Sequence, residues 1–496
     1  MTDSRPNWAA RSAGLAAAAL IAVSAVPSGQ GDPMAGRSRL VMEQRSALPA
    51  MDRGLRDQDP PRPPRDSAAA DPPYLWGSVI VKYKADADFD IVGIPAHTDP
   101  EAAAVTLRGR DDVEYAQPRY LNHAMVRPND PLYANQWNFP AIDMERAWDV
   151  QPGATSNIIV AIIDSGVAYH TGTIRYNSRF SYRLVPGGPV YPALGIVDVP
   201  FAAAPELGAS GSTRFVAPRD FIWGDETPVD LDSHGTHVTG TVGQLTNNGV
   251  GVAGMAYNVR IMPVKVIQSL WDEIFSSPNE GTDDIVARGI RYAADNGADV
   301  LNLSIGRTAG GPAPVVQEAI RYAVSQGAFV AVAAGNSRDS GNQPNRLAED
   351  APNIEGLVAV GAVGKTLGAA YYSTSASYVE ISAPGGDQRQ GGTSAGILQQ
   401  TLDLDLLETY ERPPAQYTAP RADAFAYYYF QGTSMATPHV AGFAALLMQQ
   451  GITSPAAVEA AMKKFATDKG TAGRDDLYGY GIINPRATLR GLGLAR

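Results

Sequence analysis

Short apolar runs alternate with helix-forming stretches through the middle of the chain, and this alternation limits the folds open to it. Residues 157–163 form an apolar run of the kind that a strand buried on both faces requires. Further strands are predicted at residues 298–303 and 328–334, each preceded by a predicted helix, at residues 282–297 and 315–327. Strands that alternate with helices pair in parallel, so the sequence predicts an α/β fold with a doubly wound, mostly parallel sheet.

Polar residues follow three of these predicted strands. Asp164 comes directly after the first strand, Ser304 directly after the second, and Asn336 just after the third. In an open α/β sheet the carboxyl ends of the strands meet at one edge, and sites form there. We therefore expect these three side chains to border a common cleft.

Three short segments, far apart in the chain, carry the strongest chemical signal. They are Val-Ala-Ile-Ile-Asp164-Ser-Gly, Ser-His234-Gly-Thr-His-Val-Thr-Gly and Gly-Thr-Ser434-Met-Ala-Thr-Pro-His. A serine hydroxyl needs an adjacent base to act as a nucleophile at neutral pH. A histidine can take that proton and return it to a leaving amine, and an aspartate can fix the histidine tautomer. Asp164, His234 and Ser434 are therefore the candidate catalytic residues.

In the order Asp, His, Ser, these segments resemble the subtilisin-like serine peptidases (subtilases), which use one of three unrelated chain orders for this chemistry. Each segment alone is more often a turn or a helix start, so the interpretation depends on all three. The resemblance covers residues 128–490 approximately. It implies a three-layer, doubly wound, mostly parallel α/β fold, hydrolysis of peptide bonds through an acyl-enzyme, and a precursor that processes itself.

The oxyanion of the tetrahedral intermediate needs hydrogen-bond donors. Ser434 lies at the start of a predicted helix, residues 433–449, whose N-terminus offers free N–H groups and a partial positive charge. The N–H of Ser434 can therefore help to hold the oxyanion. Ala333-Ala-Gly-Asn336 matches the family's oxyanion segment, and the resemblance makes Asn336 the second donor. Loss of such a donor costs about 100- to 1000-fold in kcat.

The resemblance also indicates which residues bind the substrate. One segment pairs with the substrate backbone as an added strand, and a second segment helps to outline the S1 pocket. Because these residues are small or apolar, we expect broad specificity for apolar or aromatic side chains. Glu349 and Asp350 would favour a basic side chain if they approached the pocket, but we interpret them as solvated loop charges. The predicted substrate-binding residues are Ser304, Ile305, Gly306, Ala333, Ala334 and Gly335.

Only one of the six histidines has the neighbours of a catalytic base, and that is His234. His237 and His439 lie in the same motifs, but we interpret them as packing residues of helices. His97 and His123 precede the predicted catalytic domain. The prediction of the general base is therefore His234 alone.

The chemistry requires no cofactor, but a structural calcium ion is an open alternative. Residues 245–252 resemble the family's tight calcium loop, and Asp130 would add a carboxylate. Oxygen-only ligation of this kind suits calcium. The family also uses an aspartate shortly after the catalytic one, and the stretch after Asp164 has none. The sequence therefore does not decide the metal ligands.

The N-terminal quarter of the chain has the pattern of targeting and precursor segments. Arg5 and Arg11 precede an apolar stretch with a small-residue cleavage site, as in a signal peptide. A Pro- and Arg-rich linker and a small α+β region follow, and the latter resembles the family's inhibitory propeptide but is one helix short of it. The predicted parts are a signal peptide at 1–25, a linker at 26–74, a propeptide at 75–127 and a catalytic domain at 128–496, with processing near residues 122–128.

Composition excludes several other functions. A net charge of −11 argues against non-specific binding of nucleic acid, and the absence of cysteine excludes a disulfide framework and a cysteine nucleophile. No segment beyond the N-terminus is apolar enough for a membrane span. We therefore expect a secreted monomer, extracellular or periplasmic, with protein or peptide substrates and its own propeptide as an intramolecular inhibitor.

Two insertions, at residues 184–216 and 387–430 approximately, are expected to form loops near the rim of the cleft. The second contains Gly392-Thr-Ser394-Ala-Gly396, which fits the nucleophile elbow of α/β-hydrolases. Asp403 or Asp405, followed by His439, would complete that triad.

An esterase that uses Ser394 is therefore one alternative function. Its weakness is that no predicted strand precedes Ser394 and that Asp164 and His234 are left unexplained. An inactive homologue that binds peptides in the cleft is a second alternative. A missing triad member would favour it, and none is missing.

Overall fold

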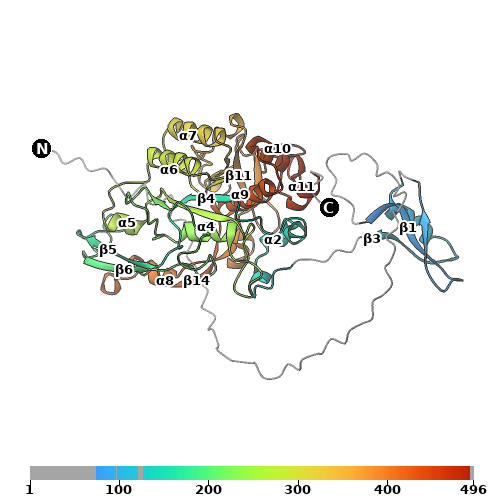
Figure 1. Ribbon diagram of the computed structural model, residues 1–496, viewed down its shortest axis with the longest axis horizontal. Coiled ribbons are helices and arrows are strands. Elements are labelled where there is room, and N and C mark those ends of the chain that lie inside the picture. The colour runs from blue at the N-terminus through green and yellow to red at the C-terminus, as the bar shows by residue number, and fades with distance from the viewer. Residues whose placement is uncertain (1–73, 96–97, 121–126, 492–496) are drawn as a thin grey trace, which may run out of the picture. The chain divides into compact units, whose positions relative to one another are not determined.

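The computed structural model describes residues 74–95, 98–120 and 127–491, and the chain divides into two compact units (Figure 1). The described part of the smaller unit is residues 74–120, and that of the larger unit is residues 127–491. The predicted signal peptide, nearly all of the predicted linker and most of the predicted processing region lie outside the described residues.

The larger unit is built on a seven-stranded sheet in the order β12-β11-β10-β9-β4-β8-β7, and every neighbouring pair is parallel. The order reverses at β4, because the chain adds β8 and β7 on one side and β9 to β12 on the other. The prediction of a doubly wound parallel α/β sheet is therefore confirmed. The strands are β4 (Ile159–Asp164), β7 (Arg219–Asp220), β8 (Arg260–Lys265), β9 (Val300–Leu303), β10 (Phe329–Ala333), β11 (Leu357–Val363) and β12 (Ile381–Pro384).

Helices cover both faces of this sheet, which gives three layers (Figure 1). On one face lie α6 (Asp283–Asp295) and α7 (Pro314–Ser325), where the sequence predicted helices. On the other lie α4 (His234–Gly243) and α9 (Thr433–Gln449), which pack on each other. Nearly every residue of α9 is buried, which is why its sequence is apolar on all sides.

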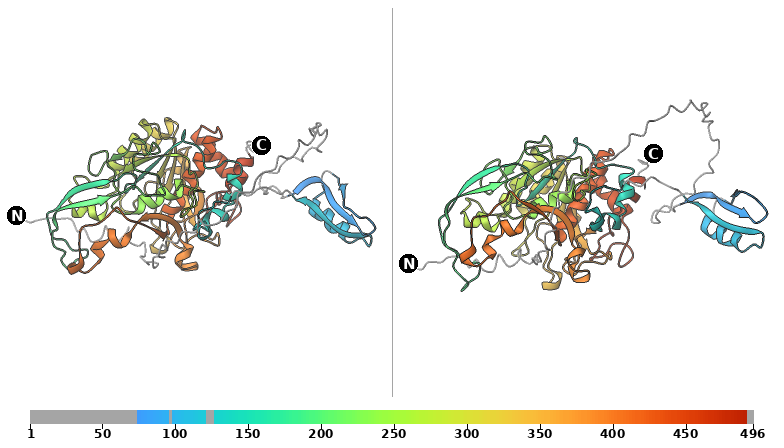
Figure 2. Two further views of the ribbon diagram at one scale, coloured as in Figure 1. Left: turned by 60° about the horizontal axis from the view of Figure 1, so that its bottom comes forward. Right: turned by 90° about the horizontal axis from the view of Figure 1, so that it is seen from below.

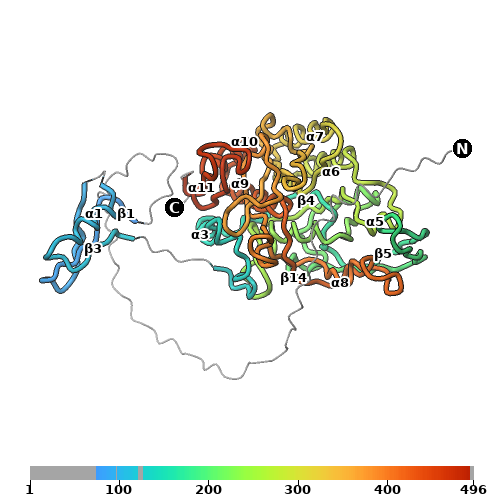
Figure 3. The backbone as a smooth tube through the Cα atoms, turned by 180° about the vertical axis from the view of Figure 1, so that it is seen from behind, coloured from blue at the N-terminus to red at the C-terminus, as the bar shows by residue number. Residues whose placement is uncertain are grey.

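Shorter helices close the ends of the larger unit. Figure 3 shows α10, α11 and α3 at one end of the unit, where α11 contacts both α10 and α3. Trp148 of α3 packs at a tilt against Tyr133 and Phe139, whose rings stack on each other, with ring centroids 5.3–6.3 Å apart. These helices are α2 (Asn138–Ala141), α3 (Met144–Trp148), α5 (Leu270–Ile274), α10 (Pro455–Phe465) and α11 (Pro485–Gly491).

The expectation that the two insertions form loops was wrong, because each contributes regular structure. The first includes β6 (Gly195–Phe201), which pairs antiparallel with β5 (Gly172–Ser178). The second forms β13 (Ile397–Leu402), α8 (Leu404–Leu407) and β14 (Phe425–Phe430), and β13 packs on α4.

The two insertions also contact each other, as Figure 2 shows at the end of the unit where β5 and β6 lie. Phe201 and Ala422 form a parallel bridge. Tyr417 packs its ring against Tyr182 and Tyr191, with centroids 5.7 and 5.4 Å away. The insertions therefore form one joint layer rather than two separate loops.

The smaller unit is a three-stranded antiparallel sheet in the order β2-β1-β3 with one helix. Asp99 caps the helix by accepting hydrogen bonds from the N–H groups of Glu101 and Ala102. These elements fit the small α+β region expected from the sequence, and β2 is only four residues long. The elements are β1 (Tyr74–Tyr83), β2 (Asp90–Gly93), α1 (Pro100–Arg108) and β3 (Val113–Tyr120). Among the described residues of both units, none of the helices is long and apolar enough to cross a membrane.

Candidate active site

Asp164 and His234 meet at the carboxyl edge of the sheet. Asp164 is the last residue of β4 and its side chain is 1% exposed, whereas His234 is the first residue of α4 and its side chain is 29% exposed. Nδ1 of His234 donates a hydrogen bond of 2.7 Å to Oδ1 of Asp164. This bond places the proton on Nδ1 and leaves Nε2 as the base.

Carboxylates around His234 outweigh its burial. Burial alone would lower the pKa of His234, but the charge and hydrogen bond of Asp164, with the charges of Asp232 and Asp230, raise it to about 9. Burial, with a contribution from Asp230, raises the pKa of Asp232 to about 6. The imidazole is therefore strongly basic.

Ser434 is the second residue of α9, and it is held against the segment that follows β9. Its hydroxyl donates to the Ser304 carbonyl at 2.9 Å, and the Ser304 hydroxyl donates to the Ser434 carbonyl at 2.8 Å. Asn302 supports this arrangement by donating to the Ser304 hydroxyl at 3.0 Å. Between the described side chains of Ser434 and His234 there is no hydrogen bond, so the hydroxyl must turn toward Nε2 before a proton can move.

Two N–H donors border one small space beside Ser434. Oδ1 of Asn336 accepts from the N–H and the hydroxyl of Thr433, each at 2.8 Å, which turns Nδ2 of Asn336 the other way. A Cβ atom on Gly432 would lie 3.4 Å from Nδ2 of Asn336 and 3.6 Å from the N of Ser434. The structure thus brings both sequence-predicted oxyanion donors together, and Gly432 keeps the space between them open.

The predicted substrate-binding residues lie on two adjacent strand ends. Ser304, Ile305 and Gly306 follow β9, while Ala333 ends β10 and precedes Ala334 and Gly335. Because β9 and β10 are neighbours in the sheet, both segments reach the same edge.

Asn345 joins these two segments, and sequence reasoning missed it. Its amide nitrogen donates to the carbonyls of Ile305 and Ala333 at 3.1 and 2.6 Å. Its amide oxygen accepts from the N–H of Arg307 at 3.2 Å. A Cβ atom on Gly306 would lie 2.3 Å from this amide, so Gly306 makes room for it. Only the burial of Asn345, at 2% exposure, distinguishes it from an ordinary loop asparagine.

Two acidic residues near the predicted pocket are paired with arginines. Glu349 forms an ion pair of 2.6 Å with Arg346, and Asp350 pairs with Arg321. Both carboxylates are therefore partly neutralised by the protein itself. Their side chains are only 26% and 17% exposed, so they form partly buried ion pairs rather than the solvated loop charges expected from the sequence.

His237 and His439 are packing residues. Both are fully buried, and burial lowers the pKa of His237 to about 3 and that of His439 to about 4. Nε2 of His237 donates to the carbonyls of Ile397 and Tyr428 at 3.0 and 3.1 Å. Nδ1 of His439 donates to the Met435 carbonyl at 2.8 Å.

The loop at residues 245–252 folds around two carboxylates with its N–H groups rather than its carbonyls. Asp130 accepts from the N–H groups of Asn247 and Asn248 at 2.8 and 3.1 Å, and Glu206 accepts from that of Val252 at 3.1 Å. Burial raises the pKa of Glu206 to about 7. Both carboxylates are thus bonded to N–H groups of the loop, and the structural calcium ion stays a prediction. In the part of the chain that the structure describes, no group of three or more acidic or histidine side chains could hold a metal ion.

The alternative nucleophile, Ser394, is not on an elbow. It lies in a short 3₁₀ helix, Thr393–Ala395, and the element before it is another 3₁₀ helix, Gln388–Gln390, rather than a strand. Asp403 caps α8 by accepting from the N–H of Asp405. With His439 bonded to Met435, the second triad is not assembled.

Comparisons with known proteins agree on one family. The sequence model of the subtilase family matches residues 155–481. A thermophilic serine proteinase of Bacillus sp. (strain AK1) is 31% identical over 434 residues, covering 83% of this chain and 86% of that protein. An extracellular protease of Xanthomonas campestris pv. campestris is 31% identical over 400 residues, covering 77% of this chain and 60% of that protein. Fervidolysin of Fervidobacterium pennivorans, a keratinolytic enzyme related to subtilisin, has a similar fold, with a TM-score of 0.53, 23% identity, and coverage of 86% of this chain and 62% of that one.

Proposed function

Since the chain belongs to the subtilase family and is a serine-type endopeptidase, we propose that Asp164, His234 and Ser434 are the triad with which it hydrolyses peptide bonds. The observation that carries the proposal is the 2.7 Å hydrogen bond between His234 and Asp164, which joins two motifs 70 positions apart. The bond leaves Nε2 of His234 free to accept the proton of a serine hydroxyl.

Acylation begins when the Ser434 hydroxyl turns from the Ser304 carbonyl to Nε2 of His234. Oγ then bonds to the carbonyl carbon of the scissile peptide while its proton passes to Nε2. The C–N bond breaks as the imidazolium returns that proton to the leaving amine. Water repeats the sequence on the acyl-enzyme, which releases the acid and restores Ser434.

The negative charge of each tetrahedral intermediate falls on the former carbonyl oxygen. The N–H of Ser434 and Nδ2 of Asn336 donate to that oxygen, because they border the space that Gly432 leaves open. The partial positive charge at the N-terminus of α9 acts in the same direction. The carboxylate of Asp164 stabilises the imidazolium through its hydrogen bond to Nδ1.

The substrate backbone lies along Ser304–Gly306 as an added strand, and its P1 side chain enters between this segment and Ala333–Gly335. The small and apolar side chains of both segments favour apolar or aromatic P1 residues. Asn345 ties the two walls together from behind, so the width of the pocket depends on it.

The smaller unit acts as an inhibitory propeptide, and the enzyme is secreted after removal of residues 1–25. The unit supports this because it is compact by itself and leaves one face of its sheet without a helix. Val79 and Val81 point into its core, whereas Ile80 and its partner Ile91, which is 56% exposed, lie on the uncovered face. The similar Xanthomonas protein is named as extracellular.

Casein hydrolysis by the full chain tests the proposal, with a fluorophosphonate label located by mass spectrometry. Wild type should cleave casein and carry the label on Ser434. Ser434→Ala should lose both and accumulate as unprocessed precursor, while Ser394→Ala, the matched control, should behave as wild type. Label on Ser394, or casein cleavage by Ser434→Ala, would overturn the proposal.

A further inference from the structure

Asp230 is a fully buried carboxylate, 1% exposed, four positions before His234. Each of its two oxygens accepts more than one hydrogen bond from the protein. Oδ1 accepts from the hydroxyl of Ser165 at 3.1 Å and from the N–H groups of Asp232 at 3.0 Å and Ser233 at 2.9 Å. Oδ2 accepts from the N–H of Thr236 at 2.9 Å and from its hydroxyl at 2.6 Å.

These bonds provide the N-terminal cap of the helix that carries His234. The residue at the cap position is Ser233, whose φ of 83° is left-handed and whose own side chain makes no capping bond. The carboxylate of Asp230 takes over this part by binding the N–H of Thr236 in the first turn and that of Ser233 just before it. A negative charge is also favoured at this end of a helix.

The same carboxylate reaches the loop that carries Asp164. Ser165, next to Asp164, donates its hydroxyl hydrogen to Asp230 and accepts the N–H of Gly235 at 2.9 Å. Ser165 therefore bridges the loop after β4 to α4, with Asp230 as the anchor. One side chain thus contacts both elements whose ends must meet for the bond between His234 and Asp164.

The two backbones touch directly at this point. A Cβ atom on Gly235 would lie 2.2 Å from the carbonyl oxygen of Gly166. A Cβ atom on Gly166, at φ 120°, would lie 2.7 Å from the N of Asp230 and from the Val229 carbonyl. With no side chains between them, the loop and the helix are held in register by hydrogen bonds, those of Asp230 and Ser165 and the one that the N–H of Ala168 donates to the hydroxyl of Thr236 at 3.0 Å.

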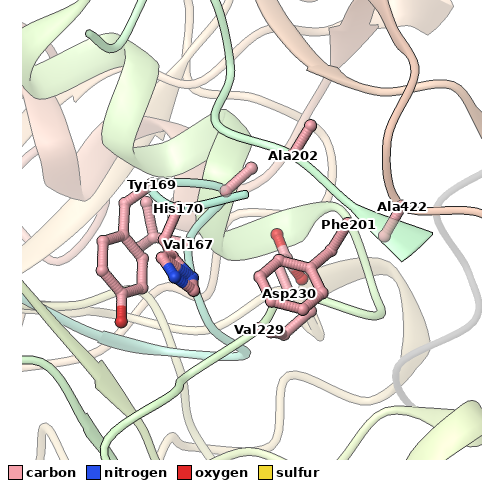
Figure 4. A pocket seen from close by; sticks show the side chains of 9 residues that line it. Val167, Tyr169, His170, Phe201, Ala202, Val229, Asp230 and Ala422 are labelled. Atoms are coloured by element: carbon pink, nitrogen blue, oxygen red, sulfur yellow. The ribbon is translucent and has the colours of Figure 1, made fainter. Parts of the chain in front are cut away.

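Asp230 does not reach the substrate. Figure 4 shows it at a small cavity, about 10 Å³, which has room for about one water. Phe201 and Ala202 from the first insertion and Ala422 from the second close this cavity. Thr401 of β13 adds a bond of 2.6 Å to the Ser233 carbonyl. The insertions thus cover the rear of the loop that leads to His234.

We propose that Asp230 is a positioning residue, whose carboxylate holds the loop after β4 and the first turn of α4 in the arrangement in which His234 meets Asp164. The proposal rests on the proposed triad. In this proposal the joint layer of the two insertions contributes indirectly to catalysis, because it shields the hydrogen bonds of Asp230 from bulk water.

Asp230→Asn is the decisive variant, because it keeps the shape and removes one acceptor. Whichever way the amide turns, its NH₂ group faces donors, so either the N–H of Thr236 or those of Asp232 and Ser233 lose their partner. We expect kcat to fall about 10- to 100-fold, as misplacement of a catalytic group by a fraction of an ångström would produce, with KM nearly unchanged.

The pH profile separates positioning from mere stability. Several charged or titratable groups surround His234. Asp164 lies on β4, Asp232 and Asp230 lie on the loop before α4, and His237 lies on α4. Farther out, Glu408 lies beyond Asp232, and Lys265 of β8 lies beside Asp230. Removal of the Asp230 charge should move the midpoint of kcat/KM to lower pH. The downfield proton resonance of Nδ1 in His234 should shift or broaden as its bond to Asp164 loosens.

The experiment compares four folded proteins by kcat, KM, pH profile and this resonance. They are wild type, Asp230→Asn, Ser165→Ala and the matched control Asp475→Asn, which removes a carboxylate that accepts three main-chain hydrogen bonds far from the triad in sequence. The control should match wild type. Folded Asp230→Asn with the kcat and pH midpoint of wild type would overturn the proposal, as would a change in KM alone.

Two further results keep the test decisive. If Asp230→Asn fails to fold, Ser165→Ala is measured in its place, because Ser165→Ala deletes the hydroxyl oxygen that bridges Asp230 and Gly235. A wild-type kcat in Ser165→Ala would then overturn the proposal. The double variant should lose less than the product of the two single losses, since both act on one bridge. Casein cleavage by Ser434→Ala would instead refute the triad, and so the two failures are distinguishable.

Discussion

His234 and His237 lie one turn apart on α4, yet their protonation is opposite. Carboxylates raise the pKa of His234 to about 9, whereas burial lowers that of His237 to about 3. His234 donates to a carboxylate, and His237 donates to two carbonyls and stacks on Phe430 with centroids 4.3 Å apart. Burial therefore does not define a base, because the charge of the partner decides which imidazole can take a proton at working pH.

The largest effect is expected when the charged partner is taken from His234. Asp164→Asn keeps the size of the side chain but allows the other tautomer, in which Nε2 carries the proton and is no longer a base. We expect kcat to fall about 10⁴-fold. Steady-state kinetics on casein-derived peptides measure this. A loss below about tenfold would mean that His234 keeps its tautomer without Asp164.

The second largest effect is expected when a hydrogen-bond donor is removed from the oxyanion site, and the pH profile then distinguishes this site from the base. Asn336→Ala removes one donor, and kcat should fall about 100- to 1000-fold. The pH midpoint of kcat/KM should stay at its wild-type value, because Asn336 carries no charge. Asn336→Asp is the informative companion, since a carboxylate beside the oxyanion should be at least as harmful. A midpoint that moved in Asn336→Ala would contradict the division of labour between His234 and Asn336.

The sequence predicts the fold and the different parts of His234 and His237 only as far as local patterns allow. The apolar runs of β4, β9 and β10 and the all-apolar helix α9 are local patterns, so the fold and the positions of Asp164, Ser434 and Asn336 could be predicted. The neighbours of His234 marked it as the base, because its motif is contiguous.

Asp230 and Asn345 could not be predicted in the same way. Their importance depends on carbonyls and N–H groups that the fold brings from distant segments, such as Ala333 for Asn345 and Ser165 for Asp230. The strands of the second insertion were missed for a related reason, because the burial of β13 depends on its contacts with α4 and other segments distant in sequence. The metal ligands could not be predicted either, since the sequence of residues 245–252 does not reveal which backbone groups point inward.

The pH dependence of the wild type tests the raised pKa directly. The imidazole must be neutral to accept a proton, so kcat/KM should rise with pH and level off above a midpoint of about 9. Two units below that midpoint only about 1% of His234 is neutral, and so activity near pH 7 should be about 100-fold below the plateau. Stopped-flow acylation across pH 6 to 10 measures this, and a midpoint near 6.5 would show that the carboxylates do not outweigh burial.

His237 is expected to matter for stability and not for the chemistry. His237→Leu leaves the carbonyls of Ile397 and Tyr428 without a donor, which should cost about 1–3 kcal/mol in the free energy of unfolding. His237→Gln, the matched control, can still donate and should lose less. Urea denaturation measures both variants. A folded His237→Leu protein with greatly reduced kcat would contradict the assignment.

The pH dependence of that stability has a defined sign. The pKa of His237 is near 6.5 in the unfolded chain and about 3 in the fold, so the unfolded state binds the proton first as pH falls. The contribution is complete above pH 6.5 and decreases toward pH 3. His237→Leu should flatten this decrease, and His439, whose pKa is also lowered, should account for part of the remainder.

The smallest effect should come from Asp232, which influences His234 by charge without holding it. The N–H of His234 lies 3.3 Å from Oδ1 of Asp232, and this carboxylate raises the pKa of His234 less than Asp164 does. Asp232→Asn keeps an oxygen for that N–H and removes the charge, so the midpoint of kcat/KM should move to lower pH while the plateau of kcat stays near that of wild type. Because the pKa of Asp232 is about 6, the two pH profiles should differ most above pH 6 and converge below it. A plateau more than about tenfold lower would instead show that Asp232 helps Asp230 to fix the first turn of α4.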